Sequence, residues 1–423
     1  MKKFIVYILR ILTKRTLTRY KPVVVGITGS VGKTSTKEAI FTLLNHTFFV
    51  AKSSENANNE IGVPCAVLGI EPSGTRDRKA TWQSRRRFLI GLMRSIALAY
   101  GPRRRHYPKI LILELGADKP GDMGYLSELL KPQVVVVTAI GEVPAHVEFY
   151  KNPEAVAREK AHILDYVGVN GFAALGADDP IVLAMSAKGG SASGGKFPFM
   201  TFGFSQGADL RASDLAYYMH DHHVAGLSFK IHKNESFVPI RVPGLVAPHQ
   251  IQSILAAAAV GLHFGMNLVE IGSALESYRA PEHRVQLITG INGSTLLDDT
   301  YNASPLSARA ALEALHELGT ALHKRRVAVL GDMKELGEYA KQAHEEIAHL
   351  APGKCDVLIT VGELAKAMGG KEHFPDVAAA AKKIPELIQP NDVVLIKGSH
   401  AMHMLDLVSA LGRSASGGDA TNK

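Results

Sequence analysis

The segment 22-PVVVGITGSVGKTSTKEAIFTLLN-45 decides the fold, because a β-branched run, a glycine-rich turn and an amphipathic stretch follow one another directly. Val23 to Thr28 predicts a buried strand, and the stretch from Lys33 to Asn45 predicts a helix. A glycine-rich turn between a strand and a helix lets backbone N–H groups approach phosphate oxygens, and a lysine adds a mobile positive charge. The segment therefore predicts a P-loop in an α/β domain.

The first glycine of the usual P-loop pattern is displaced, since position 27 holds Ile27 and Gly26 lies one residue early. A plain glycine turn with a surface lysine is the alternative interpretation. With strand, turn and helix in the required order, we expect ATP here, with Lys33 at the β and γ phosphates and the Thr34 hydroxyl at Mg²⁺. The residues assigned to ATP on this loop are Thr28, Gly29, Ser30, Val31, Gly32, Lys33, Thr34 and Ser35.

Short β-branched runs alternate with amphipathic stretches along most of the chain, which predicts an α/β fold with a mostly parallel sheet. An antiparallel excursion is expected over residues 209–243, and an Ala-rich buried helix over 248–265. A second alternating series begins after Ala280-Pro281 and predicts a C-terminal, Rossmann-like α/β domain. The predicted division is a basic amphipathic helix 1–21, a P-loop domain 22–279 with a basic insertion 71–108, a C-terminal domain 280–412 and a disordered tail 413–423.

Length and composition agree with two or three globular domains, because 423 residues exceed the size at which one hydrophobic core stops growing. The two cysteines, Cys65 and Cys355, supply neither a disulfide framework nor a metal site. This cysteine usage suits a reducing compartment, and we expect the cytoplasm.

The net charge of +8 is distributed unevenly, since residues 1–22 carry +7 and residues 76–109 carry +10, which leaves −9 on the rest of the chain. Both basic segments have an apolar centre, and aromatic residues are poorly interleaved with the basic ones. We therefore expect no nucleic-acid partner.

The two basic segments are predicted to be helices that lie at the surface of an anionic membrane. In the first, apolar residues recur at helical spacing, but Arg10 interrupts a run that is far shorter than the ~20 residues of a membrane span. The second, from Phe88 to Tyr100, lies between Arg85–Arg87 and Arg103–Arg105. A helix packed on the protein with solvated arginines is the alternative.

Further motifs follow the P-loop in a fixed order: 56-NANNEIGVP-64, 111-LILELGADKPGDMGYL-126, 145-AHVEF-149, 156-VAREKAHIL-164, 298-DDTYNASP-305, 331-GDMKELG-337 and 396-IKGSHAM-402. In these motifs the chain resembles the Mur ligase family over roughly residues 22 to 412. The resemblance implies an ATP- and Mg²⁺-dependent ligase that forms an amide bond through an acyl phosphate. It is strongest for members that join D-Ala-D-Ala to a UDP-muramoyl-tripeptide in peptidoglycan precursor synthesis, which implies those two substrates.

The resemblance also implies catalytic and metal-binding residues. Glu114, at a strand end, matches the glutamate that binds Mg²⁺, and His146 matches a histidine near a second Mg²⁺. Lys160 matches a lysine that is carbamylated in the family and so becomes a carboxylate-like ligand. From the residues alone, Lys160 is as readily a solvated lysine of a helix, because carbamylation needs a neutral amine.

Residues beyond the P-loop are assigned to nucleotide and substrates in the same way. Those expected at ATP are Gln250, Arg284, Asp299, Tyr301 and Asn302, and those expected at the substrates are Asn58, Asn59, Lys397 and Ser399. Two alternatives stay open. The segment after Asp298 can serve as a helix cap ahead of Pro305, and Lys397 can fix a strand–helix junction.

The chain also departs from the family pattern. Where the family has a His-Asn pair and a later Asn, this chain has His249-Gln250 and Ser253. Gly176 replaces a third asparagine, and His400 replaces an arginine. Only about 21 residues precede the first strand, where members of this type carry a domain that holds the UDP group. Two other functions therefore remain open: a Mur-like ligase acting on another carboxylate, and a P-loop ATPase or degenerate ligase that serves as a membrane-bound binding module.

Overall fold

A computed structural model describes residues 2–71, 82–102, 106–168, 170–186, 197–221 and 223–412, with the side chains of residues 82–85 left out. The Gly- and Ser-rich stretch 188–195, whose composition predicts a surface loop, lies outside these ranges. So do the predicted tail 413–423, Arg103–Arg105 and residues 72–81 of the basic insertion.

The larger of two sheets is built around the strand that leads into the P-loop. This strand, β1 (Val23–Thr28), pairs in parallel with β3 (Ile110–Glu114) on one side and β4 (Val134–Val137) on the other. In the described residues the strand order is β2-β3-β1-β4-β5-β6-β7-β8-β9. The remaining strands are β2 (Val50–Lys52), β5 (Phe172–Gly176), β6 (Phe199–Gly203), β7 (Leu210–His220), β8 (His223–Lys233) and β9 (Ser236–Pro243).

Among the described strands of this sheet, only β7 to β9 pair antiparallel with one another, which matches the predicted excursion. The chain builds β2 and β3 on one side of β1 and then crosses to build β4 to β6 on the other side. The loops after β1 and its neighbours therefore diverge at the carboxyl edge, which is where open α/β sheets bind ligands.

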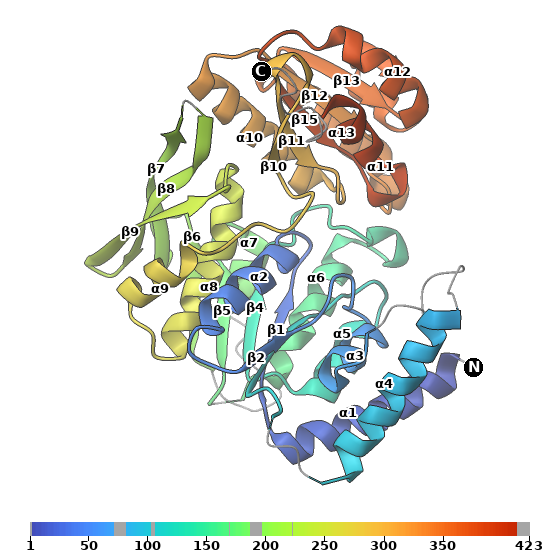
Figure 1. Ribbon diagram of the computed structural model, residues 1–423, viewed down its shortest axis with the longest axis vertical. Coiled ribbons are helices and arrows are strands. Elements are labelled where there is room, and N and C mark those ends of the chain that lie inside the picture. The colour runs from blue at the N-terminus through green and yellow to red at the C-terminus, as the bar shows by residue number, and fades with distance from the viewer. Residues whose placement is uncertain are drawn as a thin grey trace, which may run out of the picture.

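Helices cover both faces of the large sheet (Figure 1). One face is covered by α2 (Lys33–Leu44), α8 (Ile251–His263) and α9 (Leu268–Leu275). The other face is covered by α3 (Gly62–Leu68), α5 (Asp122–Leu130), α6 (Pro153–Ala161) and α7 (Pro180–Met185). The strands between them are buried on both sides, which explains their continuous β-branched sequence.

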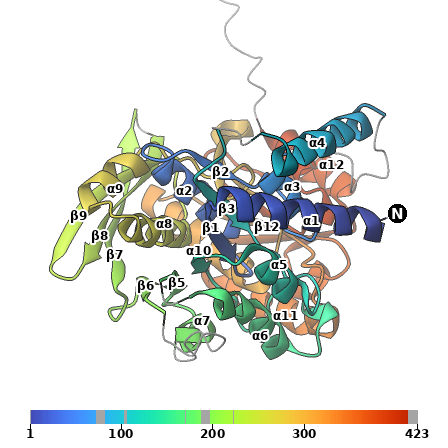
Figure 2. The same cartoon turned by 90° about the horizontal axis from the view of Figure 1, so that it is seen from below.

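Two basic helices form a further layer outside α3, as Figure 2 shows. They are α1 (Lys2–Tyr20) and α4 (Trp82–Tyr100). A small apolar cluster joins them to α3, and its members include Leu9, Leu12, Cys65, Phe88 and Ala99. Among the described residues, no helix is long and apolar enough to cross a membrane.

The second sheet has the order β10-β11-β15-β12-β13-β14 in the described residues, and only β10 and β11 pair antiparallel. Its strands are β10 (Gln286–Thr289), β11 (Thr295–Asp299), β12 (Arg326–Gly331), β13 (Val357–Val361), β14 (Glu372–Phe374) and β15 (Val393–Lys397). Its helices are α10 (Pro305–Leu322) and α11 (Ala340–Leu350) on one face, and α12 (Val377–Leu387) and α13 (Leu405–Leu411) on the other. The two mostly parallel sheets, each covered by helices on both faces, confirm the predicted α/β fold class.

A few predicted elements change their extent. The sequence predicts a strand near Phe48, but β2 begins at Val50, because the Phe48 amide still donates to Leu44 O at 2.9 Å in the turn that ends α2. The sequence also predicts a helix from Pro153 to Tyr166, but the chain is α-helical only to Ala161, and a 3-10 turn, His162–Tyr166, follows.

Candidate active site

The P-loop makes a sharp turn against the residues that follow β4. Gly29 has φ +146°, and a Cβ built on it would lie 2.0 Å from Thr138 Oγ1. Thr138 in turn donates to Val31 O at 2.6 Å, and the amides of Ser30 and Val31 both donate to Ala139 O. The predicted glycine turn is therefore held by the residues that follow β4, and position 29 has no room for a side chain.

Gly32, with φ +86°, ends the loop and is the N-cap of α2. The Thr36 amide is the first in α2 to donate back, to Gly32 O at 2.9 Å, so the amides of Lys33, Thr34 and Ser35 lack intrahelical acceptors. Ser30 Oγ is buried without a hydrogen-bond partner in the part of the chain that is described. The end of the loop thus offers several donors to an anion.

Lys33 folds back onto the loop, where Nζ donates to Gly29 O at 2.8 Å and to Ser30 O at 3.4 Å. Burial lowers the pKa of Lys33, the nearby Glu114 carboxylate opposes this effect, and Arg284 adds to it. A phosphate would replace the two carbonyl oxygens with full negative charges, which favours the ammonium form.

Thr34 connects three parts of the site. Its hydroxyl donates to Glu114 Oε2 at 2.9 Å and accepts a hydrogen bond from Arg284 Nη2 at 3.0 Å. Glu114 ends β3, is 6% exposed, and its backbone amide donates to Ser53 Oγ at 3.2 Å. Two of the predicted metal ligands, Thr34 and Glu114, therefore lie in direct contact.

Lys160 lies under the P-loop rather than in solvent. It is 2% exposed, and Nζ donates to Gly29 O at 3.3 Å. Burial, reinforced by the charge of Lys33, lowers the pKa of Lys160 to about 7, while Asp118 and Glu159 act in the opposite direction. A substantial fraction of this amine is therefore neutral near pH 7, which is the form that reacts with CO₂.

His146 bridges the two sheet units. Its Nδ1 lies 3.1 Å from Glu335 Oε2 in the C-terminal unit, and its Nε2 lies 3.6 Å from Asp118 Oδ1. The hydrogen bond with His146 lowers the pKa of Glu335. No recorded contact joins His146 to Glu114, so its place at a second Mg²⁺ stays a prediction.

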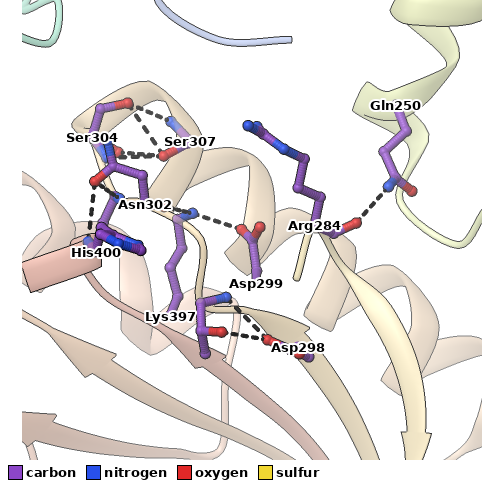
Figure 3. A network of polar contacts seen from close by, with 11 residues as sticks. Gln250, Arg284, Asp298, Asp299, Asn302, Ser304, Ser307, Lys397 and His400 are labelled. Atoms are coloured by element: carbon purple, nitrogen blue, oxygen red, sulfur yellow. Dashed lines mark hydrogen bonds and ion pairs between the residues drawn. The ribbon is translucent and has the colours of Figure 1, made fainter. Parts of the chain in front are cut away.

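The C-terminal side of the site is a network of polar contacts at the end of β11 (Figure 3). Lys397 is 2% exposed and its Nζ donates to Asp299 Oδ2 at 2.6 Å and to Asn302 O at 2.8 Å. Asn302 Oδ1 accepts from the amides of Ala303, at 2.9 Å, and His400, at 3.4 Å. The alternative role for Lys397, fixing a strand–helix junction, is thus seen directly.

The turn after β11 is also a helix cap, which was the alternative role for the segment after Asp298. Ser304 is the N-cap of α10, its Oγ accepts from the Ser307 amide at 3.4 Å, and Pro305 occupies the first turn.

Tyr301 reaches back to the large sheet unit. Arg284 lies over its ring, with 4.0 Å from the guanidinium carbon to the ring centroid, and the phenol donates to Asn56 Oδ1. Arg284 thereby contacts Thr34 through its guanidinium and Tyr301 through its planar face. The linker arginine and the predicted aromatic residue form one contact surface.

Gln250 lies at the head of the Ala-rich helix and faces the linker. Its Nε2 donates to Arg284 O at 2.8 Å, and its Oε1 accepts from the Ala247 amide at 3.2 Å (Figure 3). Its amide group is thus occupied by backbone, so contact with adenine stays a prediction. Its neighbour His249 is half-buried, and desolvation of the ring lowers the pKa of that imidazole to about 4.

A cavity of about 450 Å³ opens beside the P-loop, between the two sheet units. Its walls include Gly32, Ser35 and Thr138 from the P-loop side and Leu306 and Arg309 from α10. Its volume is within the range of small-ligand sites, and its lining mixes apolar and polar groups.

The asparagines expected at the substrate have different settings. Asn59 Oδ1 accepts from the amides of Ile61 at 3.1 Å and Gly62 at 2.9 Å and so caps the start of α3. Asn58 pairs its backbone O with the Gly116 amide at 2.8 Å, and its Oδ1 is buried without a partner in the described residues. Ser399 Oγ accepts from the Lys334 amide at 2.8 Å and holds the loop after β12.

Of the remaining P-loop residues, Thr28 and Ser35 are fixed by the protein itself. Thr28 Oγ1 donates to Leu115 O at 3.1 Å, and Ser35 O accepts from the Tyr278 hydroxyl at 3.4 Å.

Four contributors were missed from the sequence although three of them lie inside the quoted motifs. Asn56 and Asp118 lie two and four residues from residues that were chosen, Glu335 lies in a quoted motif from which no residue was chosen, and Thr138 directly follows β4. The only available signal was position at the carboxyl edge of the sheet, which applies to Thr138 and Asp118 alike.

A parallel sheet with a glycine-rich loop after its central strand, a lysine on that loop and a carboxylate at the end of the next strand defines a nucleotide-binding enzyme of the P-loop class. The sequence matches the Mur ligase middle domain over residues 98–261 and the Mur ligase glutamate ligase domain over residues 283–400.

Two curated relatives carry the same name. UDP-N-acetylmuramoyl-tripeptide–D-alanyl-D-alanine ligase of Mycobacterium leprae is 31% identical over 92% of this chain and 73% of its own length. The Escherichia coli enzyme of that name is 28% identical over 92% of this chain and 76% of its own length.

Solved structures agree with these relatives. The MurF ligase of Thermotoga maritima in complex with ADP has a TM-score of 0.76 and 26% identity, and the match covers 96% of this chain and 83% of that one. MurF of Acinetobacter baumannii has the same TM-score and identity, with 95% and 79% covered. The chain belongs to the Mur ligase family, and it is an ATP-dependent amide ligase.

Proposed function

We propose that this enzyme joins D-Ala-D-Ala to a UDP-muramoyl-tripeptide in the synthesis of peptidoglycan precursors. The observation that carries the proposal is that the Thr34 hydroxyl, on the P-loop helix, is hydrogen-bonded to both Glu114 and Arg284. A residue of the proposed nucleotide site is thus in contact with the arginine that leads into the C-terminal unit. The relatives from Mycobacterium leprae and Escherichia coli, whose names state these substrates, support the choice.

Mg²⁺ fits the residues present. Thr34 and Glu114 supply hard oxygen atoms in contact, and Mg²⁺ takes few protein ligands and completes its shell with phosphates and water. In the described ranges no group of three or more His, Cys, Asp or Glu side chains is placed to hold a metal unaided, which agrees with such an open shell. Bound there, Mg²⁺ would neutralise charge on the phosphate oxygens.

We propose that Lys160 acts as its carbamate. Its burial and lowered pKa provide the neutral amine that reacts with CO₂. The carbamate would turn a buried cation next to Lys33 into an anion, so the two side chains would attract each other instead of repelling. His146 and the carbamate are the proposed ligands of a second Mg²⁺.

In the proposed reaction the terminal carboxylate of the tripeptide attacks the γ phosphorus of ATP, and ADP leaves. The amine of D-Ala-D-Ala then attacks the carbonyl carbon of the acyl phosphate and loses a proton, and phosphate leaves. Lys33 and Arg284 would hold the phosphate oxygens, and the amides at the start of α2 would hold them in register. The chain's contribution is positioning and charge neutralisation.

The cavity of about 450 Å³ is the proposed site of the adenosine group, since it opens from Gly32 and Ser35. Asp299, Tyr301 and Asn302 then border the nucleotide from the C-terminal side. Asn58, with its unpartnered Oδ1, is the proposed substrate contact near Glu114, while Asn59, Lys397 and Ser399 act through the loops that they fix.

We propose residues 22–279 and 280–412 as the two working domains, each built on one sheet. The cytoplasm is the proposed location, since both Cys65 and Cys355 are free and buried. Peripheral contact with an anionic membrane is part of this proposal.

The test is phosphate release by the purified full chain with ATP, UDP-muramoyl-tripeptide and a panel of amines, with each product identified by mass. Product formation that depends on D-Ala-D-Ala supports the proposal, and Lys33→Ala serves as the inactive reference. ATP consumption that no amine stimulates, or a product from another acceptor alone, would overturn it.

A further inference from the structure

Helix α4 is apolar on two adjoining faces, and in the described structure only one of them is covered. Phe88, Ser95 and Ala99 are buried in the cluster shared with α1 and α3 or beside it. On the other face, Leu89, Met93, Ile96 and Tyr100 follow one another at helical spacing and are 58%, 71%, 47% and 57% exposed. A row of four large apolar side chains in solvent needs an explanation that a single exposed leucine does not.

Helix α1 carries a second exposed row. Its apolar residues do not form one face as the sequence suggested, because Leu9 and Leu12 are buried while Phe4, Tyr7 and Ile11 are 66%, 63% and 40% exposed. The Arg15 guanidinium lies 5.4 Å from the centroid of the Tyr100 ring, so the rows of the two helices meet at that end.

The basic residues of the two helices divide into two sets. Arg10 and Lys14 pair with Glu128, and Lys2 pairs with Glu60, so these cations are directed at the protein. The other set is exposed beside the apolar rows and includes Lys3, Arg15, Arg87 and Arg94. Neither helix contains an acidic residue, although the chain outside the two basic segments carries −9.

We propose that the exposed faces of α1 and α4 form a docking surface for an anionic lipid bilayer. Apolar side chains on the outside of a basic helix enter the boundary between headgroups and acyl chains, while arginines reach the lipid phosphates. The charge argues for lipid, since a protein partner of ordinary composition gives no reason to exclude every acid from both helices. The proposal deepens the location given above and is independent of which substrates the ligase takes.

The docking surface lies at the end of the molecule away from the C-terminal sheet, so a docked enzyme keeps its cleft open to solvent (Figure 1). Figure 2 shows α1 and α4 side by side as the outermost layer of the large unit. Among the described elements, none lies outside them in either view.

The test is co-sedimentation of the full chain with vesicles of phosphatidylcholine, with and without phosphatidylglycerol. Met93→Asp is the apolar variant, and Val269→Asp on α9 is its matched control because both side chains are 71% exposed. Arg87→Glu with Arg94→Glu is the charge variant, with Lys341→Glu on α11 as control. Circular dichroism and ligase rate in lipid-free buffer check that each variant is folded and active.

We expect binding to phosphatidylglycerol vesicles to fall roughly tenfold or more for Met93→Asp and for the charge variant. Both controls should stay near wild type, and pure phosphatidylcholine should bind weakly. Equal binding by Met93→Asp and Val269→Asp would overturn the proposal. So would wild-type dimerisation without lipid that Met93→Asp abolishes, because a second copy would then cover this surface. The lipid-free ligase rate reports on the proposed function separately.

Discussion

Arg284 donates a hydrogen bond from Nη2 to Thr34 Oγ1 at 3.0 Å, although the two residues are 250 positions apart. Arg284 follows the linker to the C-terminal unit, and Thr34 is the second residue of the P-loop helix. The same hydroxyl donates to Glu114 Oε2, so the arginine sits at the proposed edge of the metal site. In the proposed site, one threonine therefore links nucleotide binding to the position of the C-terminal unit.

Arg284→Ala is expected to lower kcat/KM for ATP by about 100-fold or more, because one charge-assisted donor to the developing phosphate charge is lost. Arg284→Lys should recover little, since lysine cannot both stack on Tyr301 and reach Thr34 with a planar donor set. Steady-state phosphate release measures the effect. Arg279→Ala is the control, as Arg279 is exposed and bonds only nearby carbonyls in the described structure. A similar loss in both variants would contradict the role of Arg284.

Gly29→Ala is expected to abolish ATP binding, because the new Cβ would lie 2.0 Å from Thr138 Oγ1 and the loop would have to move. Gly121→Ala separates this clash from backbone strain, since Gly121 also has positive φ, +90°, but has no atom within 4 Å of a built Cβ. The control should cost about 1–2 kcal/mol of stability and leave the affinity for ATP unchanged. Titration with a fluorescent ATP analogue measures the affinity of both variants. Wild-type affinity in Gly29→Ala would show that the contact with Thr138 does not constrain the loop.

The pH dependence of the ligase should reflect Lys160. Its pKa is lowered from 10.5 to about 7, so the neutral amine accumulates as pH rises through 7, and carbamylation and activity should rise with it. CO₂-depleted buffer should lower the rate at pH 7.5, and added bicarbonate should restore it. Lys160→Arg should be inactive at every pH and insensitive to bicarbonate. A wild-type rate that ignores CO₂ at all pH values would exclude the carbamate.

The same shift predicts a stability change. Between pH 7 and pH 10.5 the unfolded chain binds a proton at Lys160 that the folded chain does not, so the free energy of unfolding should rise with pH across this window. The rise should be absent in Lys160→Met. Urea denaturation at pH 7 and pH 9 measures it, with CO₂ excluded to keep the amine free.

The buried pair of Lys397 and Asp299 should be costly to break. Lys397→Met leaves the Asp299 carboxylate, 11% exposed, without its cation and is expected to lower the free energy of unfolding by about 3–5 kcal/mol. Adding Asp299→Asn should recover part of that loss. The exposed pair of Lys383 and Glu386 is the control, and Lys383→Met should change stability by less than about 1 kcal/mol. Equal effects of the two lysine substitutions would show that burial does not govern the pair.

The sequence was sufficient where a local pattern determines the outcome. Val23–Thr28 was predicted to the residue, because a β-branched run buried on both faces has a sharp end at a glycine turn. Thr34 was assigned to Mg²⁺ from the P-loop pattern and Glu114 from the family resemblance, and the two side chains are in contact. These are consequences of periodicity and sheet geometry.

The rest depended on contacts between distant segments. The helical sequence around Lys160 gives no indication of burial, which results from its approach to Gly29. Gln250 was assigned to adenine by position, yet its amide holds the linker carbonyl of Arg284. In α1 the period of apolar residues was visible, but which side faces α3 and which faces solvent was not, because both sides are apolar.

The linker between the two sheet units, residues 279–282, is anchored at both ends. Upstream, the Tyr278 ring is fully buried and its hydroxyl donates to Ser35 O in the P-loop helix. Downstream, His283 Nδ1 lies 2.7 Å from Asp298 Oδ2, and His283 O accepts from the Tyr301 amide. Any rotation of one unit against the other must be absorbed by the torsions of residues 279–282, one of which is a proline with its φ fixed. Rotation of the C-terminal unit is thereby confined to a short hinge with few free torsions, which lies one turn of helix from the proposed nucleotide site.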